Sequence, residues 1–142
     1  MNQRVLLDTN VLSELMRRQP DAKVLTWFEQ HTDTACVISA ITRAEVLLGI
    51  ALLPEGKRRD DLANAAELMF QEEFAGRCAP FDENATDEYA ALVAARTRIG
   101  RPISTEDAQI AAIALTNRLP LATRNVKDFS HIAGLTLMSP WD

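Results

Sequence analysis

The chain has 142 residues, of which 47% are hydrophobic and 25% are charged, and these values are typical of a single globular domain with its own core. With 15 lysines and arginines against 20 aspartates and glutamates, the formal net charge is −5, which argues against a broad basic surface for nucleic acid but does not exclude a nuclease. The longest apolar run, Val46 to Leu53, is too short to span a bilayer, and no signal-peptide core follows Met1. We therefore expect a cytoplasmic protein without a membrane partner.

Apolar runs, helical spacing and turn residues predict the elements in chain order. The first half is expected to contain a buried strand at 4–7, a helix that carries Val11, Leu12, Leu15 and Met16, a helix at 21–30, a strand at 35–38 and a long helix from Ser39 or Thr42 to residue 53. The second half is expected to contain helices at 57–74, 84–99 and 104–117, with strands at 78–81, 121–123 and 135–138.

Strands separated by helices throughout the chain predict an α/β fold with a mostly parallel central sheet flanked by helices. In such sheets, ligands bind beyond the carboxyl ends of the strands. The five glycines are too widely spaced for a dinucleotide turn or a phosphate-binding loop. Zinc-peptidase and serine-hydrolase motifs are also missing, and the only histidines are His31 and His131.

Two aspartates follow apolar strands. Asp8 comes directly after the strand at 4–7, so its carboxylate should lie at the carboxyl end of that strand, although an aspartate there also suits the N-cap of the next helix. Asp128 comes shortly after the strand at 121–123, near the same sheet edge, but taken alone it is an ordinary turn residue.

Two further acids lie near the beginnings of predicted helices. Glu45 is expected inside an apolar stripe, and Asp107 heads the buried stripe of its own helix. Each acid could instead belong to a capping box at the start of its helix, Glu45 with Thr42 and Asp107 with Ser104. The expected stripes are Ile41, Ala44, Leu48 and Leu52 beside Glu45, and Ile110, Ala111 and Ala114 beside Asp107.

All four acids, together with Asn125, should project to one rim of the sheet. Carboxylates gathered in this way raise one another's pKa unless a cation joins them. Oxygen ligands without histidine or cysteine suit Mg²⁺ or Mn²⁺. The sequence therefore predicts a site for a hard divalent cation at this rim.

Four segments, in order and spaced over essentially the whole chain, resemble PIN-domain ribonucleases, specifically the VapC/FitB toxins of bacterial toxin–antitoxin pairs. These segments are Leu6–Glu14, Ser39–Val46, Asp107–Ala114, and Thr123–Asn125 with Phe129. The resemblance implies a single PIN-like domain over residues 1–142. It further implies a metal-dependent endoribonuclease that is neutralised by a cognate antitoxin inserted into the acidic site, and that is usually a homodimer.

The resemblance also assigns roles to residues. It implies Asp8, Glu45 and Asp107 as the core catalytic and metal-binding acids, with Thr9 in support. For the fourth acidic position, both Asn125 and Asp128 remain open. Candidate phosphate contacts are Arg96, Arg98, Arg101 and Arg124.

Two alternatives come from other classes of protein. A binding module could keep the same fold without chemistry, although an intact Asp8, Glu45 and Asp107 set argues against it. A phosphatase that forms an aspartyl-phosphate on Asp8 would need a second acid two residues later, where this chain has Asn10.

Overall fold

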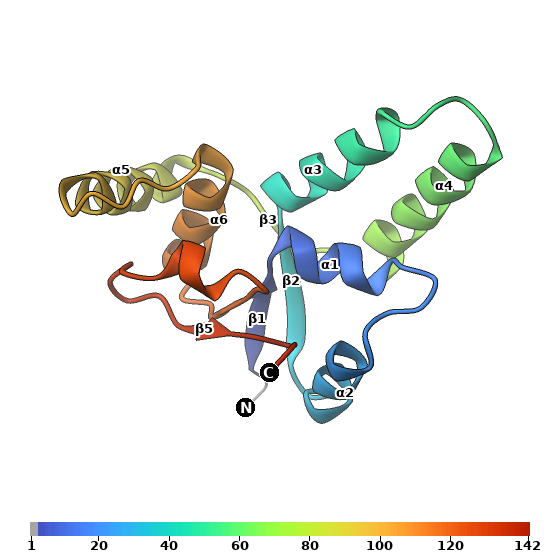
Figure 1. Ribbon diagram of the computed structural model, residues 1–142, viewed down its shortest axis with the longest axis horizontal. Helices are drawn as coiled ribbons and strands as arrows, with labels where there is room; N and C mark the ends of the chain where they lie inside the picture. Colours follow the sequence, from blue (N-terminus) through green and yellow to red (C-terminus); the bar gives the residue numbers. More distant parts are fainter. Residues whose placement is uncertain (1–2) are drawn as a thin grey trace.

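A computed structural model describes residues 3–142, and these form a five-stranded sheet with helices on both faces (Figure 1). The strands lie in the spatial order β3-β2-β1-β4-β5, and every neighbouring pair is parallel. The prediction of a mostly parallel sheet is therefore confirmed, and the observed sheet is wholly parallel. The strands are β1 (Arg4–Leu7), β2 (Ala35–Ser39), β3 (Cys78–Ala79), β4 (Leu121–Ala122) and β5 (Leu137–Met138).

The described residues contain six α-helices and one short 3₁₀ helix, η1 (Val126–Phe129). Between residues 3 and 142, none of these helices combines the length and the apolar character that a membrane span requires. The α-helices are α1 (Thr9–Leu15), α2 (Ala22–Gln30), α3 (Ala40–Ala51), α4 (Lys57–Glu72), α5 (Glu83–Arg98) and α6 (Thr105–Thr116).

The predicted boundaries agree with the structure within two residues, and two of the differences lie at the sheet edges. The strand predicted at 78–81 ends at Ala79, and the strand predicted at 135–138 begins only at Leu137. Both are edge strands with a single neighbour, so their ladders extend only where that neighbour pairs. Helix α5 begins at Glu83, one residue before the predicted start, because the Asp82 carboxylate caps it by accepting a hydrogen bond from Ala85 N at 3.1 Å.

Successive side chains along β1 point to opposite faces of the sheet and contribute to two separate hydrophobic cores. Leu6 faces the core beneath α5 and α6, whereas Val5 and Leu7 face the core beneath α1, α3 and α4. In Figure 1 the two groups of helices accordingly lie on opposite sides of β1 and β2, and α1 starts from the end of β1. The carboxyl ends of β1 and β4 are thus left between the two helical layers.

Helix α3 buries a different face from the predicted one. Its buried residues are Thr42, Val46 and Ile50, whereas Leu48 and Leu52 of the predicted stripe are 59% and 75% exposed. The apolar run around this helix has no single hydrophobic side, so packing against α1 and α4 selects the face that is covered. Glu45 is consequently exposed rather than enclosed in an apolar stripe.

Candidate active site

Asp8 is held at the carboxyl end of β1 by the neighbouring strand. The register pairs Leu7 with Ala122, and Asp8 N donates to Ala122 O at 2.9 Å, which places Asp8 beside Thr123. The Asp8 carboxylate is only 4% exposed. Its Oδ1 accepts from Thr9 N at 2.8 Å, and its Oδ2 accepts from the Thr123 hydroxyl at 2.7 Å. Asp8 therefore caps α1 and also presents a fixed, buried carboxylate.

A chain of hydroxyl groups positions Glu45. The Thr9 hydroxyl donates to Glu45 Oε1 at 2.8 Å and lies 3.0 Å from the Thr42 hydroxyl, which in turn accepts from Ser39 Oγ at 3.2 Å. Because Thr9 gives its proton to Glu45, Thr42 donates to Thr9. Ser39 is the N-cap of α3, since Ser39 Oγ accepts from Thr42 N at 3.0 Å, and the capping-box alternative for Thr42 and Glu45 is thereby excluded.

Asp107 reaches the same region from the first turn of α6. Ser104 caps this helix, because Ser104 Oγ accepts from Asp107 N at 3.2 Å. The side chain of Asp107 is half-buried and faces the pocket that Asp8 and Glu45 also line. Of the predicted capping box, the hydrogen bond from Asp107 N to Ser104 Oγ is present, and the Asp107 side chain lines the acidic pocket.

The three acids share one open pocket of about 490 Å³. Asn125 also lines it, and Asn125 N donates to the Thr123 hydroxyl at 3.0 Å. Asp128 instead lines a neighbouring hollow, although its charge is felt at Asp107. Of the two residues open for the fourth position, the structure therefore brings Asn125 to the pocket wall.

Burial and mutual repulsion change the acidity of two of these groups. Burial raises the pKa of Asp8 to about 6, and the charges of Asp107 and Glu45 add to the increase, while hydrogen bonds from Thr123 and Thr9 N oppose it. Burial also raises the pKa of Asp107, helped by the charges of Asp128 and Glu45 and opposed by Ser104. The pocket therefore concentrates negative charge that is costly to maintain without a counter-charge.

Without divalent cations, Asp8 should make the free energy of unfolding fall as the pH rises from about 4 to about 6. Its pKa is higher in the folded protein than the ordinary value of 3.8, so the folded state binds the proton more tightly. The resulting stabilisation is complete below the ordinary pKa and is lost as the pH passes through the folded value, on the order of 3 kcal/mol in all. In urea unfolding with EDTA present, the free energy of unfolding of Asp8→Asn should rise relative to that of the wild type as the pH increases across this range. A difference in unfolding free energy that does not change with pH would contradict the raised pKa of Asp8.

The oxygen groups suit a hard cation, but they do not enclose one. Among residues 3–142, no three carboxylate, imidazole or thiol groups converge closely enough to hold a metal ion as they stand. Mg²⁺, however, commonly uses only one or two carboxylates and keeps several waters. The buried, preoriented Asp8 carboxylate with Asp107 across the pocket fits this kind of binding.

The four arginines predicted to contact phosphate do not line the acidic pocket. Arg96 is 5% exposed and donates to three carbonyl oxygens, those of Arg101, Asp128 and Ser130, at 2.7 to 3.0 Å. It therefore ties the end of α5 to η1, which does not support the predicted phosphate contact. Arg124 lies over the ring of Trp141, and Arg98 and Arg101 are exposed elsewhere.

Some residues of the site were not anticipated from the sequence. Thr123 is completely buried and holds Asp8, and Thr42 holds Thr9. The signal for Thr123 was available: it follows an apolar strand just as Asp8 does, and parallel neighbours end at the same edge. Glu14 and Arg17, which also line the pocket, carry no comparable signal because an i, i+3 charge pair is common on helices.

The wholly parallel sheet, with carboxylates gathered at the carboxyl ends of its central strands, defines this molecule as an α/β protein of PIN fold. A family model for the PIN domain matches residues 5–135. The chain therefore belongs to the PIN-domain family.

Several known proteins are similar over nearly their whole length. The plasmid stability protein StbB of Pseudomonas syringae pv. tomato is 44% identical, with 97% of this chain and 99% of that protein covered. The VapC ribonuclease Y4jK of Sinorhizobium fredii is 40% identical, with 97% and 98% covered. Among solved structures, FitAcB from Neisseria gonorrhoeae matches with a TM-score of 0.88 and 39% identity over 96% of this chain and 98% of that one. A structure of FitAB bound to a DNA fragment matches with a TM-score of 0.89 and 38% identity, with 97% and 96% covered.

Proposed function

We propose that this protein is a Mg²⁺- or Mn²⁺-dependent endoribonuclease that hydrolyses RNA phosphodiester bonds. The observation that carries the proposal is that Asp8, Glu45 and Asp107 line one open pocket, where burial, together with the charges of Asp107 and Glu45, raises the pKa of Asp8. The test is RNA cleavage by the purified protein, freed of any antitoxin, with Mg²⁺ or Mn²⁺ and with EDTA. Cleavage that EDTA stops supports the proposal.

Asp8 and Asp107 are the residues that would hold the cation. When bound, a divalent cation supplies a Lewis acid that stabilises negative charge on the scissile phosphate and favours the ionisation of water. The Thr123 hydroxyl and Thr9 N each occupy one oxygen of Asp8, so the carboxylate is oriented before any ligand arrives. This preorganisation reduces the cost of ordering the site during the reaction.

Glu45 is suited to orient the attacking water and accept its proton. Glu45 is exposed and lines the pocket, the Thr9 hydroxyl holds its Oε1, and no residue among 3–142 donates a hydrogen bond to its Oε2. A carboxylate fixed through one oxygen and open at the other can act as a general base.

We further propose that the protein is the toxin of a toxin–antitoxin pair, inhibited by an antitoxin that inserts into the acidic pocket. Support comes from the relatives named VapC ribonuclease and Toxin FitB, and from a similar solved structure described as a toxin–antitoxin complex. An antitoxin would have to supply positive charge to neutralise the carboxylates. A short neighbouring gene that encodes a DNA-binding protein would support this role.

The exposed side of α3 suits a homodimer interface. Helix α4 of the same chain covers Val46 and Ile50. It leaves Leu47, Leu48 and Leu52 with 42%, 59% and 75% of their surfaces exposed. Three leucines in one short segment form an apolar patch that a second copy could cover, and two-fold symmetry is the commonest solution.

Replacing Leu48 or Leu52 with glutamate should convert a dimer to a monomer near 15.8 kDa. A buried charge at the interface lacks a partner, whereas the same charge on the monomer surface is solvated. Light scattering at micromolar concentration measures the mass. Leu25→Glu is the matched control, because Leu25 is 42% exposed on α2, away from this patch. A wild-type protein that is already monomeric would refute the dimer.

A further inference from the structure

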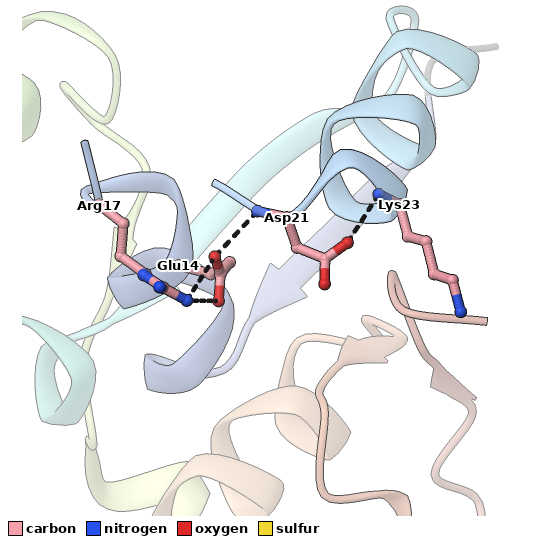
Figure 2. A network of polar contacts seen from close by, with 4 residues as sticks. All are labelled: Glu14, Arg17, Asp21 and Lys23. Carbon is pink, nitrogen blue, oxygen red and sulfur yellow. Dashed lines mark hydrogen bonds and ion pairs between the residues drawn. The ribbon is translucent and has the colours of Figure 1, made fainter. Parts of the chain in front are cut away.

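Glu14 is a buried carboxylate that the proposed chemistry does not use. It is 5% exposed, and its Oε2 accepts from Asp21 N at 3.0 Å. Both of its oxygens accept from Arg17 Nη1, at 3.3 and 3.2 Å. Figure 2 shows Glu14 between the guanidinium of Arg17 and the backbone of Asp21. Glu14 thus fixes the turn between α1 and α2 and, with it, the position of Arg17.

Among residues 3–142, Arg17 is the one arginine that lines the acidic pocket. Its side chain is 65% exposed, and only Nη1 is engaged by Glu14 among residues 3–142, so Nε and Nη2 remain available as donors. A planar guanidinium matches the geometry of a phosphate through two parallel hydrogen bonds. The ion pair therefore holds a guanidinium group with two unused donors in the lining of the acidic pocket.

A larger groove of about 1020 Å³ continues from the acidic pocket between α1, α3 and α4, and Arg17 lines both hollows. Four of the charged residues along this groove are basic and two are acidic, the reverse of the balance in the whole chain. The charged residues are Arg17, Arg18, Lys57 and Arg58 against Glu45 and Asp61. Such a local excess of positive charge beside a carboxylate pocket is complementary to a phosphodiester backbone.

We propose that Arg17, held by Glu14, binds an RNA phosphate next to the scissile one, and that the strand continues along the groove between α1, α3 and α4. This role of Arg17 rests on the proposed ribonuclease function, because it concerns how the same site would bind its RNA substrate. Glu14 is a positioning residue here, because it acts only through Arg17. A protein segment in the same groove is the competing occupant that the experiment must separate from RNA.

The test measures binding of a short fluorescein-labelled single-stranded RNA of mixed sequence by fluorescence anisotropy. The full-length Asp107→Asn protein serves as the parent, so that cleavage does not interfere. Arg17→Gln should weaken binding about tenfold, the size of one charge-assisted contact. It should also reduce the slope of log K against log salt by about 0.7. Arg17→Lys keeps the charge but loses the planar fork, and it should lie between the two.

Two further variants separate binding from folding. Lys23→Gln removes an equal charge from α2 near the same network and should leave RNA binding unchanged. Since Arg17→Gln leaves the buried Glu14 charge poorly compensated, the double variant Glu14→Gln/Arg17→Gln removes both charges and should bind as weakly as Arg17→Gln.

The result that overturns the proposal is RNA binding by a folded Arg17→Gln protein, or by the double variant, at the parent's affinity and salt slope. A parent protein that binds no RNA also overturns the proposal. So does an Arg17→Gln protein that keeps its affinity for RNA and loses affinity only for a co-expressed antitoxin.

RNA cleavage by the wild-type protein is measured in a separate assay. Cleavage that does not depend on Arg17 rejects this inference alone, whereas no cleavage with either metal rejects the proposed function.

Discussion

Asp8→Asn should cleave RNA roughly 10²- to 10³-fold more slowly than the wild-type protein in the presence of Mg²⁺ or Mn²⁺. The substitution keeps the shape of the side chain and can still accept from Thr9 N or Thr123. It removes the negative charge at the most deeply buried point of the acidic pocket, where the pKa of about 6 leaves the group ionised at neutral pH. The measurement is the initial rate on a single-stranded RNA, with EDTA as the zero point.

Two further variants are compared with Asp8→Asn in the same assay, one with an intermediate expected loss of rate and one as a control. Thr123→Val removes the hydroxyl that donates to Asp8 Oδ2 at 2.7 Å, and it should cost about 10- to 100-fold, as is usual for a group that orients a ligand. Asp33→Asn makes the same chemical change in the turn before β2, at the opposite end of the sheet, and should leave the rate unchanged. If Asp8→Asn retained the wild-type rate with equally purified samples, the nuclease assignment would fail.

Divalent metal should raise the melting temperature of the wild-type protein and have little effect on Asp107→Asn. At a free metal concentration one hundred times Kd, mass action stabilises the folded state by about 2.7 kcal/mol, or roughly 8 °C for a domain of this size. Without metal, Asp107→Asn should melt no lower than the wild type. The reason is that burial and neighbouring acids raise the pKa of Asp107 and make its charge unfavourable to folding.

The control for this measurement is Asp87→Asn, which removes one carboxylate from the exposed surface of α5. It should keep the full response to Mg²⁺ or Mn²⁺, because Asp87 does not line the acidic pocket. A shift in melting temperature that persisted undiminished in Asp107→Asn would show that Asp107 is not a principal ligand.

Local patterns in the sequence were sufficient to predict the elements that carry the acids. An apolar strand ending at Asp8, and a helix beginning after Ser104 with Asp107 in its first turn, both appear in the structure as expected. They could be predicted because strand alternation, helical spacing and N-capping depend on residues a few positions apart. Since every strand is parallel, the carboxyl ends of β1 and β4 meet at one edge, and the gathering of acids there followed from the predicted topology.

The tertiary structure alone decided three features of the site. The cover from α1 and α4 selected the buried face of α3 and left Glu45 exposed, which an apolar run on every side of a helix cannot specify. The register of β1 on β4 placed Thr123 on Asp8, and the turn after β4 brought Asn125 rather than Asp128 to the pocket. The contacts of Arg96 with the carbonyl oxygens of Asp128 and Ser130 showed that this arginine is a buried structural residue rather than a phosphate contact. Each of these depends on contacts between segments far apart in the chain, where packing and hydrogen-bond partners, rather than local propensity, determine which way a side chain points.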